Sequence, residues 1–194
     1  MMGRVLLPLS VLVVALLLGA GSAWWMVMHP PTSHRLTIGP WRTSTDVGSE
    51  NAGMYLRANI AVTGLFALNT SEAVYFFAAT DDIGQPLRAA CSYAVAGKPV
   101  AARWWSITAY GDDNFLIPNP ANRFSFNMGN LETGADGTFE LIAAPTEQPG
   151  HWLPTGGGAG GFNLTFRIYN AAPELLANLA TIALPSIRAI GSCA

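Results

Sequence analysis

The chain opens on an apolar run, Val5–Met28, that contains no charged residue. A helix needs about 20 such residues to cross the hydrocarbon core of a bilayer. The small residues of Gly21–Ala23 would suit a signal peptidase, because they follow a basic start and an apolar stretch. The run nevertheless continues through Trp24 and Trp25, and paired Trp residues suit a membrane interface. Residues 1–28 are therefore predicted to be an uncleaved membrane anchor, with a cleaved signal peptide as the alternative.

A short linker separates this apolar run from a body with a different pattern. Pro30 and Pro31 stiffen residues 29–35, which are predicted to form a spacer. A chain of 194 residues permits one domain of ordinary size plus an appendage, and no internal repeat is visible. The body is therefore predicted to be a single domain that covers residues 36–194.

Within the body, the first apolar run predicts a helix and the later runs predict strands. On a helix, the apolar residues of Met54–Leu68 would point in nearly every direction, and the segment has one charge. This helix is therefore expected to be buried on most sides. Asp81–Gly84 is a turn between two apolar runs, which are expected to pair as a hairpin. Pro173 suits the start of a short terminal helix that ends at Ala180. The predicted strands, with the hairpin pair first, cover residues 73–80, 87–95, 104–110, 123–127, 138–143 and 162–169.

This order of short strands and polar turns indicates a mainly β fold. We expect an antiparallel β-sandwich, jelly-roll-like, with one buried helix near its start and a single N-terminal transmembrane helix before it. Successive residues of a strand point to opposite faces of the sheet. Trp105 is therefore expected to pack inside with Ile107, while Trp104 lines a surface.

Composition and charge exclude one class of partner. Hydrophobic residues make up 51% of the chain and charged residues 11%, so the body can bury a substantial core. The formal net charge is -2, and the ten basic residues are scattered singly. Nucleic-acid binding is not expected, because no basic patch is present to neutralise phosphates.

The chain contains two cysteines, Cys91 and Cys193. An even pair of cysteines in an exported chain favours one disulfide, which here would close a loop of about a hundred residues. The alternative is two unrelated thiols. The predicted bridge would tie the C-terminal tail to the strand that contains Cys91.

Three segments carry a family resemblance: residues 104–123, residues 151–154 and residues 162–169. Together they resemble a bacterial family known as domain of unknown function 1214, and the resemblance extends over about residues 39–188. It implies a β-sandwich and supplies no reaction. Longer members of that family carry a companion domain in front, whereas here a membrane helix takes its place. An activity built between the two domains would be lost in this short form.

The sequence offers little for metal, cofactor or nucleophilic chemistry. Only three imidazoles are present, without the spacing of a zinc or calcium site, so neither a metal nor a cofactor is expected. The glycines of residues 156–161 lack the following helix and the Lys of a phosphate loop, which favours a flexible connection. Ser106 lies within a strand and not on a nucleophile elbow.

Arginines inside apolar runs are the more informative residues, because an unpaired buried charge is costly. The structural interpretation pairs them with Glu72, Asp81 or Asp112 across the sheet. The functional interpretation places an anionic or polar ligand on the arginines, between aromatic walls. The candidate ligand-binding residues are Arg57, Tyr75, Asp81, Tyr93, Tyr110, Arg123, Trp152 and Arg167.

Two functions are compatible with these observations. The first is a non-catalytic module that binds a ligand or a protein partner, as an accessory subunit of a membrane complex would. It would be held by one helix in the bacterial inner membrane, with the globular domain on the periplasmic side. The second is a cell-envelope hydrolase or lyase that uses an Arg/Tyr/Asp cleft. We favour the first, while enzymatic activity stays open.

Overall fold

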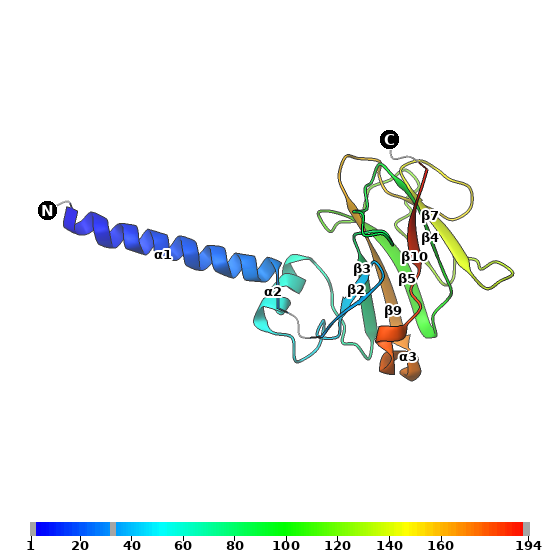
Figure 1. Cartoon of the computed structure of the whole chain (residues 1–194), viewed down its shortest axis with the longest axis horizontal. Coiled ribbons are helices and arrows are strands. Elements are labelled where there is room, and N and C mark those ends of the chain that lie inside the picture. Colours follow the sequence, from blue (N-terminus) through cyan, green and yellow to red (C-terminus); the bar gives the residue numbers. More distant parts are fainter. Residues whose placement is uncertain (1–2, 32–33, 192–194) are drawn as a thin grey trace.

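A computed structural model describes residues 3–31 and 34–191 of the chain. Helix α1 (Gly3–Met28) projects from a β-rich body, and its C-terminal end contacts a second helix, α2 (Met54–Val62) (Figure 1). The segment Leu7–Met28 is long and apolar enough to cross a membrane, and no part of it is buried in the protein. The body begins with strand β1 at Arg35, the last residue of the predicted spacer.

The body contains two β-sheets, as expected for a mainly β fold. The larger sheet has six strands, and all its neighbouring strands are antiparallel. In spatial order these strands are β1 (Arg35–Ile38), β2 (Trp41–Ser44), β3 (Ala73–Ala78), β9 (Phe162–Ala171), β5 (Ala102–Gly111) and β6 (Ser125–Asn127). The smaller sheet has the order β10 (Ser186–Ile190), β4 (Ser92–Gly97), β7 (Phe139–Ala144) and β8 (Trp152–Pro154). Helix α3 (Pro173–Ala177) and a 3-10 turn, η1 (Leu179–Thr181), form the predicted terminal helix.

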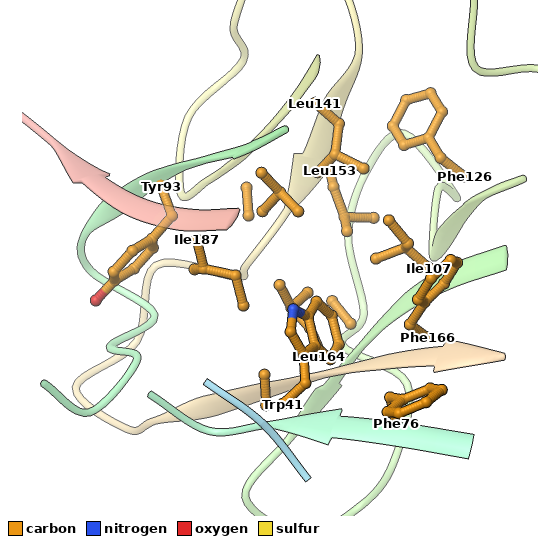
Figure 2. Packing of buried hydrophobic residues seen from close by; sticks show 14 of the residues in the cluster. Trp41, Phe76, Tyr93, Ile107, Phe126, Leu141, Leu153, Leu164, Phe166 and Ile187 are labelled. Atoms are coloured by element: carbon orange, nitrogen blue, oxygen red, sulfur yellow. The ribbon is translucent and has the colours of Figure 1, made fainter. Parts of the chain in front are cut away.

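The hydrophobic core lies between the two sheets and draws side chains from both (Figure 2). Phe76 and Phe166 come from the larger sheet, whereas Leu141 and Ile187 come from the smaller one. The indole Nε1 of Trp41 donates a 2.6 Å hydrogen bond to the carbonyl of Pro185, just before β10. This bond links the two sheets at one edge of the core.

The tryptophan pair lies as predicted, because the strand alternates between the core and the outer face. Trp105 and Ile107 are fully buried, whereas Trp104 is 42% exposed. Trp105 stacks on Phe139 and meets Phe166 edge to face. Its Nε1 has no hydrogen-bond partner in the described part of the chain.

The prediction that the helix after Gly53 is buried was wrong. Helix α2 ends at Val62, short of the predicted end, and Leu56 is its single buried residue. Met54 and Val62 remain exposed. The apolar sequence was read as a sign of burial. Helix α2 instead contacts α1 and lies across the cleft from the outer face of the larger sheet, so only one of its sides faces the body.

The predicted hairpin was also wrong, although its turn forms. The Asp81 carboxylate accepts hydrogen bonds from the amides of Ile83 and Gln85. After the turn the chain pairs with β3 only through an isolated bridge from Thr80 to Pro86. The amide of Leu87 still donates to the carbonyl of Ala79, but the amide of Arg88 donates to the Tyr93 hydroxyl. The chain then crosses to the smaller sheet, where it forms β4.

The two sheets are not wholly antiparallel, because β7 and β8 run parallel. The connecting loop leaves β7 after Ala144, and β8 begins with Trp152 beside Ile142. The loop therefore runs back along β7 by only two residues, or ~7 Å. A short loop can cover that distance without a crossover helix. Strands β1, β2, β8 and β10 were not predicted from the sequence.

Cys91 is buried in the core beside β4, and the described residues include no free cysteine. Cys193 lies outside the described residues, so its pairing with Cys91 stays a prediction.

Candidate functional site

A cleft of about 720 Å³ lies on the outer face of the larger sheet, opposite the core. Strand alternation builds its floor, since every second side chain points away from the smaller sheet. In β9, Phe166 and Ile168 are buried in the core, whereas Thr165, Arg167 and Tyr169 line the cleft. Four strands contribute to the floor in this way: Arg42 from β2, Tyr75 and Phe77 from β3, Asn163, Thr165, Arg167 and Tyr169 from β9, and Tyr110 from β5.

Helix α2 and the segment after it form the roof of the cleft. The residues that line it here are Leu56, Asn59 and Ile60 of α2 and Thr63, the C-cap of the helix. Their spacing of i, i+3, i+4 and i+7 places them on one face of the helix. The apolar residues Leu65, Phe66 and Leu68 extend the roof beyond the helix.

Hydrogen bonds of the Tyr75 side chain connect this roof to the floor. Its hydroxyl accepts a 3.0 Å hydrogen bond from the amide of Leu68 and donates a 3.3 Å bond to the carbonyl of Phe66. One side chain of β3 therefore satisfies two backbone groups of a segment without regular structure. Tyr75 fixes the distance between roof and floor as well as walling the cleft.

Arg167 lies at the centre of the floor. Its Nη1 donates to the hydroxyl of Thr108 at 3.2 Å, and its Nη2 donates to the hydroxyl of Tyr110 at 2.8 Å. Its guanidinium carbon lies 5.3 Å from the centroid of the Tyr110 ring. Both hydrogen-bond partners are neutral, and no carboxylate of the described residues lies within ion-pair distance of Arg167. Its positive charge therefore stays uncompensated in a half-buried site.

The cleft as a whole is basic, although the chain is acidic overall. Arg42 and Arg167 line it, and none of the described lining residues is acidic. The formal net charge of the chain is -2, so two positive charges without an acidic neighbour are a local departure from the average. This arrangement can hold an anion through charge-assisted hydrogen bonds.

Three of the eight candidate residues from the sequence lie together in this cleft: Tyr75, Tyr110 and Arg167. The register of the sheet explains their proximity. Tyr75 pairs directly with Arg167 across β3 and β9. Tyr110 pairs with Asn163 on the other side of β9, within reach of a long side chain from residue 167.

The other two candidate arginines lie elsewhere and bind backbone carbonyls. Arg57 donates to the carbonyls of Ala52 and Glu50. Arg123 donates to the carbonyl of Trp152 and lies over the ring of Phe126. The expected ion pairs with Glu72, Asp81 or Asp112 were wrong, because loop carbonyls are closer to these exposed guanidinium groups than any described carboxylate.

The three remaining candidates stabilise local structure outside the cleft. Asp81 holds the turn after β3. The hydroxyl of Tyr93 accepts a bond from the amide of Arg88, while its ring packs in the core. The indole of Trp152 donates to the carbonyl of Ala144.

Sequence reasoning missed several lining residues. Arg42 was missed because β2 was not recognised as a strand. Asn163 and Thr165 share a face with Arg167, and their alternation with Phe162, Leu164 and Phe166 in the sequence was a usable signal.

Two solved structures are similar to this chain, and the first of them supports the fold. The chain is similar to the VPA0106 protein from Vibrio parahaemolyticus, with 24% identity and a TM-score of 0.58 over 73% of this chain and 36% of that one. It is also similar to an uncharacterised protein from Burkholderia cenocepacia, with 16% identity and a TM-score of 0.47 over 87% of this chain and 39% of that one. This chain thus spans well under half the length of either. No curated protein matches it.

The family comparison agrees with the segments that the sequence singled out. The family described as "protein of unknown function (DUF1214)" matches residues 72–173, which is more than half of the chain. The match begins just before β3 and ends at the first residue of α3, so it includes most of the cleft floor. The chain therefore belongs to the DUF1214 family.

Proposed function

We propose that this protein is a membrane-tethered, exported binding module that holds a small ligand in the cleft without transforming it. The observation that carries this proposal is the combination of an apolar roof with a floor that presents an uncompensated Arg167. Clefts of 300–1,000 Å³ with a few convergent polar groups are typical of small-molecule sites.

The proposed tether is α1, retained as an uncleaved anchor. It continues as one helix through Gly21–Ala23 to Met28, without a break at the alternative cleavage site. Its exposed apolar surface would be costly in water and is matched to a bilayer. A jelly-roll-like sandwich exported to the periplasmic side of the bacterial inner membrane remains our interpretation of the body.

The lining of the cleft supports binding more than catalysis. Acid–base and nucleophilic catalysis need groups such as Asp, Glu, His, Lys or Cys within hydrogen-bond reach of the reacting atoms. None of the described residues that line the cleft is of these types. Tyrosine and threonine hydroxyls do line it, but no Asp, Glu, His or Lys among the described lining residues could act as a base beside them. The hydroxyls of Tyr75 and Tyr110 are already engaged in hydrogen bonds within the protein. The hydrolase or lyase alternative required a carboxylate beside the arginines, and Asp81 is engaged in a turn instead.

Native mass spectrometry of the full chain, tagged and extracted in detergent from its own membranes, tests this proposal. Ala79→Trp places an indole in the cleft, whereas Ala101→Trp adds the same group at an exposed position outside it. We expect a small bound mass on the parent protein and on Ala101→Trp, and its loss from Ala79→Trp. A bare chain in all three samples would overturn ligand binding, and a co-purifying protein would favour an accessory subunit instead.

The tether is tested separately by alkaline extraction and intact mass. An anchored protein stays in the membrane pellet with α1 present in its mass. A soluble product that begins after Ala23 would show that the segment is a signal peptide. Alkaline phosphatase fused after the body reports on its side of the membrane, because that enzyme is active only after export.

A further inference from the structure

Helix α2 has two different apolar faces. One face lines the cleft, and the other is exposed, with Met54 77% and Val62 54% exposed. Just beyond the helix, Phe66 lines the cleft and is also 87% exposed. The only charge on the helix is Arg57, which turns back to bind the carbonyls of Ala52 and Glu50. Large apolar residues that are exposed together on one short segment favour a contact surface.

The position of α2 indicates what surrounds this exposed face. It contacts the C-terminal end of α1, where Trp24 and Trp25 lie (Figure 1). If α1 spans the bilayer, that end is at the lipid–water boundary, so the exposed face of α2 lies there too. The roof of the cleft is then the part of the body nearest to the membrane.

The cleft has an apolar side and a polar side. Leu56, Ile60, Leu65 and Phe66 give the roof side an apolar lining. Arg167 and the polar groups around it occupy the floor. A ligand that satisfies both parts has a hydrocarbon portion and one polar end.

We propose that the cleft binds a single-chain amphiphile with one carboxylate, of the fatty-acid class. The carboxylate lies on the Arg167 guanidinium, and the hydrocarbon chain lies beneath α2. This inference rests on the proposed function and specifies its ligand.

The charge pattern selects a monoanion. A guanidinium has five N–H donors, and two of its donor atoms on Arg167 already serve Thr108 and Tyr110, so a carboxylate can take the remaining N–H groups. Because its oxygen accepts from Arg167, the Tyr110 hydroxyl is free to donate its own proton to the same carboxylate. Arg42 comes from β2, two strands or ~10 Å from β9 in the sheet. The Arg167 side chain extends the other way, to Tyr110 of β5 on the far side of β9. One head group therefore meets one guanidinium.

A photolabel tests this inference on the full chain in nanodiscs of neutral phosphatidylcholine. The probe is a palmitic acid analogue with a diazirine midway along its chain, used beside the matching alcohol and the matching monophosphate ester. Labelled peptides are mapped by mass spectrometry. Labelling of α1, which meets lipid in every case, provides the internal reference.

We expect the fatty acid to label peptides of α2 and β9 in preference to the alcohol and the phosphate. Arg167→Met should lower this labelling by ~10-fold, because a charge-assisted hydrogen bond is lost. Arg167→Lys keeps the charge and should retain most of the labelling. Arg123→Met is the matched control, since Arg123 binds a carbonyl outside the cleft, and it should change nothing.

Any one of three results would overturn the assignment. They are equal labelling by the acid and the alcohol, stronger labelling by the phosphate, and acid labelling that Arg167→Met leaves unchanged. Failure of this inference is distinguishable from failure of the proposed function. If no probe labels α2 or β9, yet native mass spectrometry shows a bound mass that Ala79→Trp removes, the cleft binds another class of ligand. If both are negative, the proposed function fails as well.

Discussion

The guanidinium of Arg167 lies 2.8 Å from the hydroxyl of Tyr110, although the two residues are not paired across the sheet. Arg167 is paired with Ser106, and Tyr110 with Asn163. The arginine side chain therefore runs along the face of the sheet, over Thr108, to reach the tyrosine. This path places the charge in the middle of the cleft floor and not above its own Cα atom.

Tyr110→Phe tests this relationship because it removes one acceptor and keeps the ring beneath the cation. We expect the free energy of unfolding to fall by ~1 kcal/mol, since a hydrogen bond to a charged group is lost and water can partly replace it. A double-mutant cycle with Arg167→Met, measured by denaturant unfolding, should give a coupling energy of ~0.5–1.5 kcal/mol. Strictly additive effects would mean that the two side chains do not interact in solution.

Two buried tryptophans offer a matched comparison. Trp41 and Trp105 are both 1% exposed, but Trp41 donates to the carbonyl of Pro185, whereas Trp105 has no partner among the described residues. Replacement by Phe removes similar volume at both sites. Only at Trp41 does it also leave a buried carbonyl unsatisfied, which costs about 1–3 kcal/mol. Trp41→Phe should therefore lower the free energy of unfolding by ~1–2 kcal/mol more than Trp105→Phe, and equal costs would contradict the bond.

Gly48 and Gly64 both have positive φ angles, but their surroundings differ. A Cβ atom at Gly48 would lie 2.0 Å from the carbonyl oxygen of Leu68, while one at Gly64 would meet nothing within 4 Å. Gly64→Ala should cost ~1–2 kcal/mol, which is the strain of the left-handed backbone. Gly48→Ala should cost a further ~1–3 kcal/mol from the clash.

Gly48→Ala should also weaken ligand binding, because Leu68 belongs to the roof of the cleft. Thermal unfolding and photolabelling of the two variants measure the two effects. Labelling that is unchanged in Gly48→Ala would mean that the roof adjusts without altering the site.

The sequence predicted the long strands well because their alternation is strong. β5 and β9 each have ten residues, with apolar core residues on one side and mostly polar or half-buried residues on the other, so the sequence pattern located them. Strands β1, β2, β8 and β10 have three to five residues, too few for a period to emerge. Their pairing comes from tertiary contacts such as the bond from Trp41 to Pro185.

The candidate site was partly predictable for a related reason. An arginine between Phe166 and Ile168 must face the opposite side of the strand, and that argument located Arg167. No local pattern distinguishes it from Arg57 or Arg123, whose partners are carbonyls of loops that the sequence does not place. The same uncertainty affected α2, because apolar residues that meet a membrane or a cleft resemble residues that meet a core.

The register of the smaller sheet is compatible with the predicted bridge between Cys91 and Cys193. Ile190 of β10 pairs with Ser92 of β4, so the chain reaches residue 191 beside the position of Cys91. Cys193 is two residues further on, within ~7 Å of chain. The loop of about a hundred residues would contribute at most ~4–5 kcal/mol to stability in the chain-entropy model.

Mass spectrometry of protein isolated from membranes, alkylated before and after reduction, tests this bridge. We expect both cysteines to resist alkylation until reduction. Cys193→Ser should lower the unfolding midpoint markedly in the exported protein, while β10 keeps its pairing with β4 because five residue pairs remain. The same variant made in a reducing cytosol should differ little from its parent, since neither then contains the bridge. Alkylation of both thiols without reduction would contradict the disulfide and would remove one argument for export.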